Sequence, residues 1–176
     1  WVKTIHGLCS SIIQEFPLQA GLQGGERILL EDESKVIWSQ SVALLWSQNE
    51  NEEISKALEI LLDLYSKKRL EELLFKLKNL MSFGVQNFIQ LERPEVAALW
   101  LVFQGVYHRY QHFKNRSGSL DFNDLELFAE KALESIEVQR YFQDRFDLVL
   151  VDEFQDTNPV QGRILELLVR PGYQNL

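Results

Sequence analysis

The chain has 176 residues and a mass of 20.6 kDa, and 45% of its residues are hydrophobic, which is the size and composition of about one globular domain. Its longest apolar run, 97–103, is far shorter than the roughly 18 residues that a membrane-spanning helix needs, and its single cysteine, Cys9, excludes an internal disulfide and fits a reducing compartment such as the cytoplasm. The net charge of −8 excludes a small basic module that binds nucleic acid through bulk electrostatics, so any contact with nucleic acid has to be local.

Apolar residues recur at helical intervals along the first two thirds of the chain. The first such stretch follows Thr4, which can cap a helix, and the acidic cluster 31–33 favours the N-terminus of the second helix, where the helix dipole stabilises negative charge. Pro94 begins the most regular stretch, which carries an unbroken aromatic and aliphatic stripe. This period is typical of a helix that packs on a core, rather than of a platform on which bases stack.

The same pattern continues toward the C-terminal end. Asp121 or Asn123 can cap one further helix, and Asn158 followed by Pro159 begins the last one. We expect the acidic excess around 119–147 to lie on a solvated surface. Helices are predicted over about 4–16, 31–47, 54–65, 70–77, 94–113, 123–133, 137–143 and 159–168.

The period changes at 146–151, a short and nearly uninterrupted apolar run that is rich in β-branched residues. Such a run is typical of a strand that is buried on both faces of a parallel sheet. It is the one convincing strand in the sequence, and we expect the helical region before it to fold around a single core.

Two acids, Asp152 and Glu153, follow this predicted strand directly. Ligands of parallel sheets bind at the carboxyl ends of the strands, which is where a metal and a nucleotide would lie. Successive side chains of an extended backbone point to opposite sides, so one acid could hold Mg²⁺ while the other polarises the attacking water. The alternative is an ordinary strand that ends in two solvated acids.

The whole string Val-Asp-Glu-Phe-Gln-Asp-Thr-Asn at 151–158 resembles the Walker B motif of UvrD/Rep-type superfamily-one DNA helicases. The resemblance implies that these residues bind ATP and Mg²⁺. Asp152 would bind the metal, usually through its water shell, and Glu153 would be the catalytic base beside that metal. Gln155 would sense the γ-phosphate and couple hydrolysis to movement.

A second match lies at 4–9, where Thr-Ile-His-Gly-Leu-Cys resembles the T-x-H motif of the same family. It implies that Thr4 and His6 contact the phosphate backbone of single-stranded DNA. The segments 15–22 and 120–125 are more similar to the RecB/AddA branch, which includes exodeoxyribonuclease V beta-type proteins, than to UvrD.

The resemblance also implies a domain layout and a mainly α fold. The chain would be a piece of the first RecA-like α/β motor domain, a P-loop fold, with the helical insertion of that domain. Residues 1–16 would form an edge of the motor domain, 17–143 the inserted helical subdomain, and 144–176 a motor segment that carries remnant strands and the Walker B motif.

The parent would be an ATP-dependent DNA helicase of the helicase-nuclease type. It would couple ATP hydrolysis to translocation on single-stranded DNA in double-strand-break repair and recombination. Its partners would be a second helicase-nuclease subunit, single-stranded DNA and DNA ends. The competing hypothesis is a helical protein-interaction module without catalytic activity.

One motif of the family is missing from the sequence. None of the nine glycines is followed by lysine, so the phosphate-binding loop G-x-x-x-x-G-K-[ST] is absent, as are a second motor domain and a nuclease domain. Because the chain also begins at Trp1 rather than at methionine, we expect an excised piece that does not hydrolyse ATP by itself.

Histidines and cysteine offer two other patterns. His6 and Cys9 are three residues apart and could share a metal, but no further ligand lies nearby, so a DNA contact or a structural role is favoured for His6. His108 and His112 have the spacing of a helical metal pair but lie opposite the aromatic stripe, which predicts exposure to solvent. The basic cluster 67–69 is expected in a solvated turn between helices.

Overall fold

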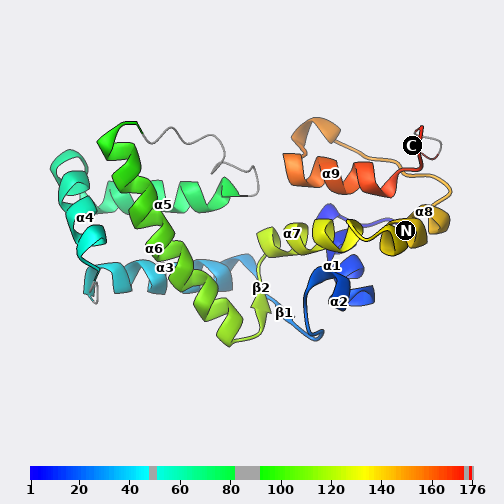
Figure 1. Ribbon diagram of the computed structural model, residues 1–176, viewed down its shortest axis with the longest axis horizontal. Helices are drawn as coiled ribbons and strands as arrows, with labels where there is room; N and C mark the ends of the chain where they lie inside the picture. Colours follow the sequence, from blue (N-terminus) through cyan, green and yellow to red (C-terminus); the bar gives the residue numbers. More distant parts are fainter. Residues whose placement is uncertain (48–50, 82–91, 173–174, 176) are drawn as a thin grey trace. The chain divides into compact units, whose positions relative to one another are not determined.

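The computed structural model describes residues 1–47, 51–81, 92–172 and 175 of the chain (Figure 1). They divide into two compact units, one made of residues 1–28 and 120–176 and the other of residues 29–119. Helices dominate both units, so the predicted mainly α fold is confirmed. Two strands of two residues each, β1 (Arg27–Ile28) and β2 (Ser119–Leu120), pair where the chain passes from one unit to the other.

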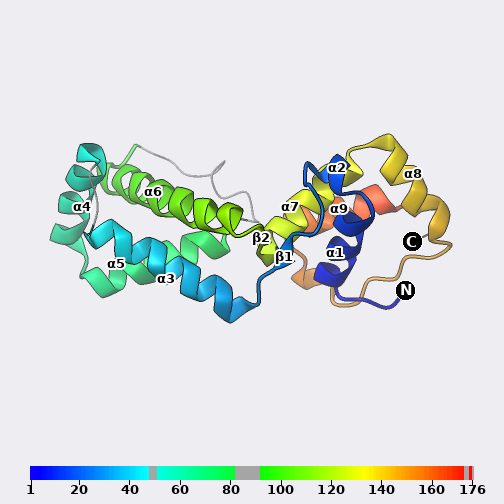
Figure 2. The same ribbon diagram turned by 90° about the horizontal axis from the view of Figure 1, so that it is seen from below.

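The first unit is built around helix α7 (Phe122–Leu133), which packs against α1 (Ile5–Glu15), α2 (Pro17–Ala20), α8 (Ile136–Arg145) and α9 (Pro159–Leu168) (Figure 2). A short 3-10 helix, η3 (Phe154–Asp156), precedes α9. The core is apolar and includes Ile12, Leu133 and Phe142, none of which is exposed. Segments from both ends of the sequence therefore share one core.

The second unit consists of α3 (Glu31–Ser47), α4 (Glu52–Leu64), α5 (Lys67–Asn79) and α6 (Pro94–Arg116), and α6 packs against the other three helices. The aromatic stripe of α6 lies in this core, where Phe103 and Tyr110 are buried, as predicted. At Gly105 the α4 side chain of Ile54 comes so close that a Cβ atom would lie 2.6 Å from its Cδ1 atom. The absence of a side chain at this position lets α4 and α6 approach each other.

The predicted strand over 146–151 is wrong, because the structure has no regular strand there. Leu148 and Leu150 are 60% and 81% exposed. Within 147–151, the one backbone hydrogen bond to another described residue runs from the Val149 N–H to the Asn175 carbonyl, at 2.6 Å. An apolar β-branched run forms a buried strand only where neighbouring strands complete its hydrogen bonds, and the described residues supply no such strands.

The prediction of a single core for the helical region is also wrong. Helices α7 and α8 pack with α1, α2 and α9, whereas α3 to α6 form a core of their own. Amphipathic periodicity shows which face of a helix is buried but not which neighbour buries it. The compact units divide at residues 28 and 120, not at the expected boundaries of 16 and 143; the extent of the inserted subdomain stays a prediction.

Candidate functional site

The acid pair lies in a tight turn at the surface of the first unit. Asp152 and Glu153 are exposed, and Glu153 has a φ of 51°, which makes it the one non-glycine residue with positive φ among those described. L-residues adopt this left-handed conformation rarely, and it concentrates at functional sites. The Glu153 N–H donates to the Asp152 Oδ1 atom at 3.0 Å, so the first carboxylate fixes the start of the turn.

The turn continues into η3, which carries the third predicted nucleotide residue. The Gln155 Nε2 atom donates a hydrogen bond to the Glu153 Oε2 atom, so these two side chains lie together. The Thr157 Oγ1 atom closes the turn by donating to the Phe154 carbonyl at 2.8 Å. Side chains at 152 and 153 would point to opposite sides of an extended backbone, but the left-handed turn at Glu153 means that the backbone is not extended there.

The donor set of this turn fits Mg²⁺ held together with a nucleotide. Mg²⁺ prefers oxygen ligands, and proteins usually bind it through one or two carboxylates, with water and phosphate oxygens completing the shell. Asp152 and Glu153 are two such accessible carboxylates. The described part of the chain contains no group of three or more His, Cys, Asp or Glu side chains that could hold a metal ion without other ligands.

The two residues of the predicted DNA contact lie at the N-terminal end of α1. Thr4 caps this helix, as predicted: its Oγ1 atom accepts a hydrogen bond from the Gly7 N–H at 3.2 Å. A threonine hydroxyl that accepts one bond can still donate another. The His6 side chain is 37% exposed, and its ring stacks on the ring of Phe122 with the centroids 4.7 Å apart.

The Nε2 atom of His6 lies 3.1 Å from the Oε1 atom of Glu126, a residue that the predicted site did not include. Glu126 comes from α7, and only 2% of its side chain is exposed. Its Oε1 atom also accepts from the Gln161 Nε2 atom at 2.6 Å, and its Oε2 atom accepts from the Asn158 Nδ2 atom at 2.8 Å. Glu126 therefore joins the T-x-H segment to the end of the 151–158 string.

Opposing effects act on the pKa of Glu126. Burial raises the pKa of this carboxyl, but hydrogen bonds from His6, Asn158 and Gln161, with the charge interaction with His6, outweigh burial and hold the pKa below its usual range. Glu126 is therefore a carboxylate at neutral pH. Three donors satisfy it, as a buried charge requires.

The partners of Glu126 on α9 are held by their own backbone contacts. Asn158 caps α9, as predicted, by accepting from the Gln161 N–H at 2.9 Å, and the Gln161 Oε1 atom accepts from the Asn158 N–H at 3.2 Å. This capping box fixes both side chains while their amide nitrogens donate to Glu126. The start of α9 is thus tied to α7 through a single carboxylate.

The expectation that the acids around 119–147 are solvated is wrong for part of the segment. Asp121 and Asp124 are buried and form the capping box of α7, and Glu126 is buried two residues later. One signal for Glu126 was present in the sequence: it lies three and seven residues before Ala129 and Leu133, on the apolar stripe of the helix. A carboxylate on an apolar stripe requires a partner.

Other candidate residues have structural surroundings. His108 and His112 are exposed on α6, as predicted. Cys9 is fully buried, and burial, followed by the nearby charge of Glu126, raises the pKa of its thiol to about 12, so the group is a neutral thiol rather than a metal ligand. The side chain of Lys67, from the basic cluster, lies over the ring of Trp46, with its Nζ atom 4.7 Å from the ring centroid.

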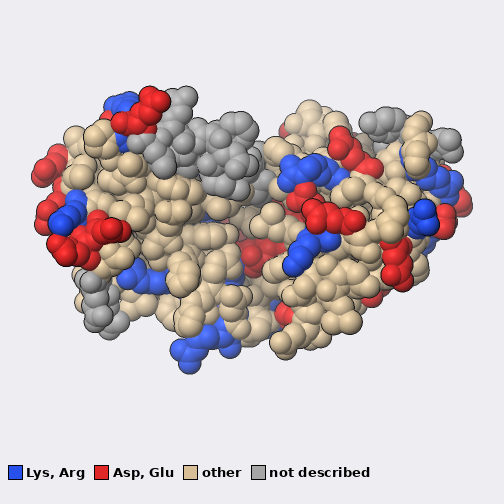
Figure 3. All heavy atoms as spheres, viewed as in Figure 1, with Lys and Arg blue, Asp and Glu red and all other residues tan. Residues whose placement is uncertain are grey.

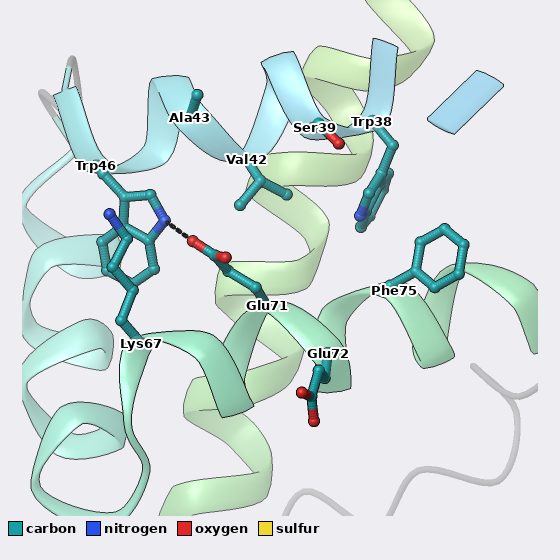
Figure 4. A pocket seen from close by; sticks show the side chains of 9 residues that line it. All are labelled: Trp38, Ser39, Val42, Ala43, Trp46, Lys67, Glu71, Glu72 and Phe75. Carbon is teal, nitrogen blue, oxygen red and sulfur yellow. Dashed lines mark hydrogen bonds between the residues drawn. The ribbon is translucent and has the colours of Figure 1, made fainter. Parts of the chain in front are cut away.

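A groove of about 470 Å³ lies in the second unit between α3 and α5 (Figure 4). Trp38 and Trp46 from α3 and Phe75 from α5 line it, and the Trp46 Nε1 atom donates to the Glu71 Oε1 atom at 2.9 Å. The groove contains none of the predicted site residues. It therefore belongs to the helical unit and not to the candidate site.

Charges on the visible face are mixed, and Figure 3 shows no continuous stripe of basic side chains among the described residues. Acidic side chains gather over α4, where Glu52, Glu53, Glu59 and Asp63 are exposed. This distribution agrees with the net charge of −8, which predicts local rather than bulk contact with nucleic acid. None of the helices in the described ranges has the length and apolar character that crossing a membrane requires.

Comparison with known proteins gives a family match along nearly the whole chain. The family described as "UvrD/REP helicase N-terminal domain" matches residues 1–175. This match and the names of the relatives described below confirm the resemblance drawn from the 4–9 and 151–158 motifs, including its AddA-type branch.

Three curated relatives illustrate the similarity. The chain is 39% identical over 84 residues to the AddA-type subunit of an ATP-dependent helicase/nuclease from Listeria monocytogenes, a match that covers 46% of this chain and 7% of the relative. It is 39% identical over 104 residues to a "Putative ATP-dependent DNA helicase YjcD" of Bacillus subtilis, covering 54% and 13%. A "Probable DNA helicase II homolog" of Mycoplasma capricolum is 26% identical over 175 residues, covering 96% and 22%. The chain thus spans less than a quarter of the length of each of these relatives.

Proposed function

Because the chain belongs to the UvrD/REP helicase N-terminal domain family, we propose that it is part of the first motor domain of an ATP-dependent DNA helicase of the helicase-nuclease type. In this proposal the parent protein couples ATP hydrolysis to translocation along single-stranded DNA. The observation that carries the proposal is the Glu126 carboxylate, which binds His6 of the T-x-H segment and Asn158 of the 151–158 string at once. The two motif segments, which are far apart in the sequence, meet in one unit.

In the proposed nucleotide site, Asp152 holds Mg²⁺ through its water shell, with Glu153 beside it. The bound metal would neutralise negative charge on the phosphate oxygens. The exposed Glu153 carboxylate orients a water molecule and accepts its proton, as a general base does. Gln155 contacts Glu153 directly, which supports a role in sensing the γ-phosphate, because a shift of its amide would move the base.

In the proposed DNA site, Thr4 and His6 contact the phosphate backbone of a single strand. Thr4 is exposed, and its hydroxyl keeps its own proton for donation while it caps α1. His6 presents the exposed part of its ring beside Phe122. Both side chains lie near the N-terminus of α1, where the helix dipole favours phosphate.

The wider context of the parent is part of the same proposal. We assign it to double-strand-break repair and recombination in the cytoplasm, with DNA ends as substrate and an exodeoxyribonuclease V beta-type organisation. Its protein partner would be a second helicase-nuclease subunit. Residues 1–16 and 144–176 would belong to the motor domain and residues 17–143 to its insertion. Since the sequence contains no phosphate-binding loop, the chain by itself would not hydrolyse ATP.

The proposal is tested by measuring ATP hydrolysis by the full-length protein with and without oligo(dT). The substitution Glu153→Gln removes the proposed base and keeps its shape, so ATP binding is expected to persist while turnover falls by about 100-fold or more. Glu166→Gln, an equivalent change at an exposed position of α9, is the matched control and keeps normal turnover.

Two results would contradict the proposal. Unchanged turnover of the Glu153→Gln protein would remove Glu153 from its assigned role. A full-length wild-type protein that neither binds oligo(dT) nor hydrolyses ATP would favour the competing hypothesis of a helical interaction module.

A further inference from the structure

Glu126 is a buried carboxylate that none of the roles proposed above uses. Its side chain is 2% exposed within a core that is otherwise apolar, and it receives three donors from two other segments. Burial of a charge is costly, and well-packed hydrophobic residues often replace buried ion pairs without loss of stability. Stability alone therefore does not account for a carboxylate at this position.

The donors to Glu126 come from two segments with different proposed tasks. The His6 Nε2 atom, 3.1 Å from the Glu126 Oε1 atom, belongs to the segment assigned to DNA, and the Asn158 Nδ2 atom, 2.8 Å from the Oε2 atom, belongs to the segment assigned to the nucleotide. The two donors thus share one acceptor group. A displacement of the imidazole by a bound phosphate would therefore act on the same carboxylate that holds Asn158.

The contacts beyond Glu126 are stiff in both directions. On one side the His6 ring stacks on Phe122, which begins the same helix as Glu126. On the other side Asn158 is fixed by the α9 capping box, and it directly follows the turn that Thr157 closes onto η3. A change at His6 thus has a continuous physical route to Glu153 and Gln155.

We propose that Glu126 is a positioning residue that couples the DNA-contacting His6 to the nucleotide-binding turn through Asn158. This inference rests on the proposed function, because it requires that the parent hydrolyse ATP in response to single-stranded DNA. It assigns no chemical step to Glu126. The carboxylate holds two segments in a fixed relation, so that DNA binding at one is felt at the other.

The experiment measures the oligo(dT) concentration that gives half-maximal stimulation of ATP hydrolysis by the full-length protein. Glu126→Gln keeps the size of the side chain but replaces one acceptor oxygen with a donor nitrogen, which opposes the donors of Asn158, Gln161 or His6. We expect the half-maximal concentration to rise about tenfold, the usual effect of losing a hydrogen bond to a charged group.

A matched control lies one helical turn further along α7. Glu130 forms a partly exposed ion pair with Arg163 of α9, so Glu130→Gln changes the same type of residue between the same two helices without touching His6 or Asn158. We expect this variant to keep the wild-type half-maximal concentration. An equal shift in both variants would overturn the proposal, because it would show a general effect of the α7–α9 contact.

A second variant keeps the test decisive if Glu126→Gln fails to fold. Serine is as good a helix cap as asparagine, but its hydroxyl is too short to replace the Asn158 amide at Glu126. Asn158→Ser therefore preserves the start of α9 and removes the link, and the same direction of shift is expected. A folded Asn158→Ser protein with wild-type response to oligo(dT) would overturn the coupling.

A double-mutant cycle separates coupling from a merely structural role. If Glu126 acts on DNA through His6, adding Glu126→Gln to His6→Ala causes no further rise in the half-maximal concentration. Additive effects of the two substitutions would contradict the proposal. Absence of any DNA-stimulated ATP hydrolysis in the wild type would instead refute the proposed function, so the two failures are distinguishable.

Discussion

The two units of the chain bury charged groups in different ways. In the unit of residues 29–119, Lys114 and Lys78 are buried against one aromatic ring, with their Nζ atoms 4.5 Å and 5.0 Å from the centroid of Tyr110. In the unit that contains both chain ends, Glu126 is buried among donors from α1 and from the start of α9. The lysines lie within an aromatic helical core, whereas Glu126 joins the two segments that carry the family motifs. A buried charge thus marks a candidate for function only where its partners carry chemistry.

The largest expected effect concerns the aromatic core of the 29–119 unit. Phe103 is fully buried and stacks on Trp100 and Tyr107, with ring centroids 5.3 Å and 5.4 Å apart. Phe103→Ala should lower the free energy of unfolding by about 3–5 kcal/mol, because it removes buried area and leaves a cavity. Urea denaturation followed by tryptophan fluorescence measures this loss. A loss below about 1 kcal/mol would show that the stripe is not the core of this unit.

The next effect concerns the polar connection of the other unit. Glu126→Ala leaves three donors without their shared acceptor and should lower the free energy of unfolding by about 2–3 kcal/mol. The same denaturation experiment applies. Unchanged stability would mean that water or another acceptor replaces the carboxylate, and the comparison between the two units would lose its basis.

A smaller effect is expected from pH. The pKa of Glu126 is lower in the folded chain than its usual value of 4.5, so the stabilisation that it provides is fully present above pH 4.5 and is lost as the pH falls through its folded pKa. Free energies of unfolding at several values between about pH 7 and pH 3 should show this loss in the wild type and a weaker loss in Glu126→Gln. Identical pH profiles would argue against a buried, ionised Glu126.

The smallest effect belongs to the partly exposed pair on the same two helices. Glu130→Ala removes the ion pair with Arg163, whose side chain is 52% exposed, and should change the free energy of unfolding by less than about 1 kcal/mol. Thermal or urea denaturation beside Glu126→Ala gives the contrast. A cost equal to that of Glu126→Ala would indicate that burial of Glu126 contributes nothing special.

Local features of both units were predictable from the sequence. The helical periods, the caps at Thr4 and Asn158 and the buried stripe of α6 all follow from residues within a few positions of each other. Such features depend on the chain's own hydrogen bonds and on one amphipathic face, which the sequence displays directly.

Non-local features were not predictable in the same way. The run 146–151 has the composition of a buried strand, but a strand exists only with partners, and the described residues provide none. His6 and Glu126 are far apart in the sequence, so no local pattern reports their contact. The left-handed turn at Glu153 likewise depends on surrounding hydrogen bonds and not on the preference of glutamate.

The most direct test of the coupling is hydrogen-deuterium exchange on the full-length protein with and without oligo(dT). Binding at Thr4 and His6 is expected to slow exchange at the start of α1 and also at 152–158, and in Glu126→Gln the change at α1 should persist while the change at 152–158 disappears. If 152–158 responded to oligo(dT) equally in both proteins, Glu126 would not connect the two segments.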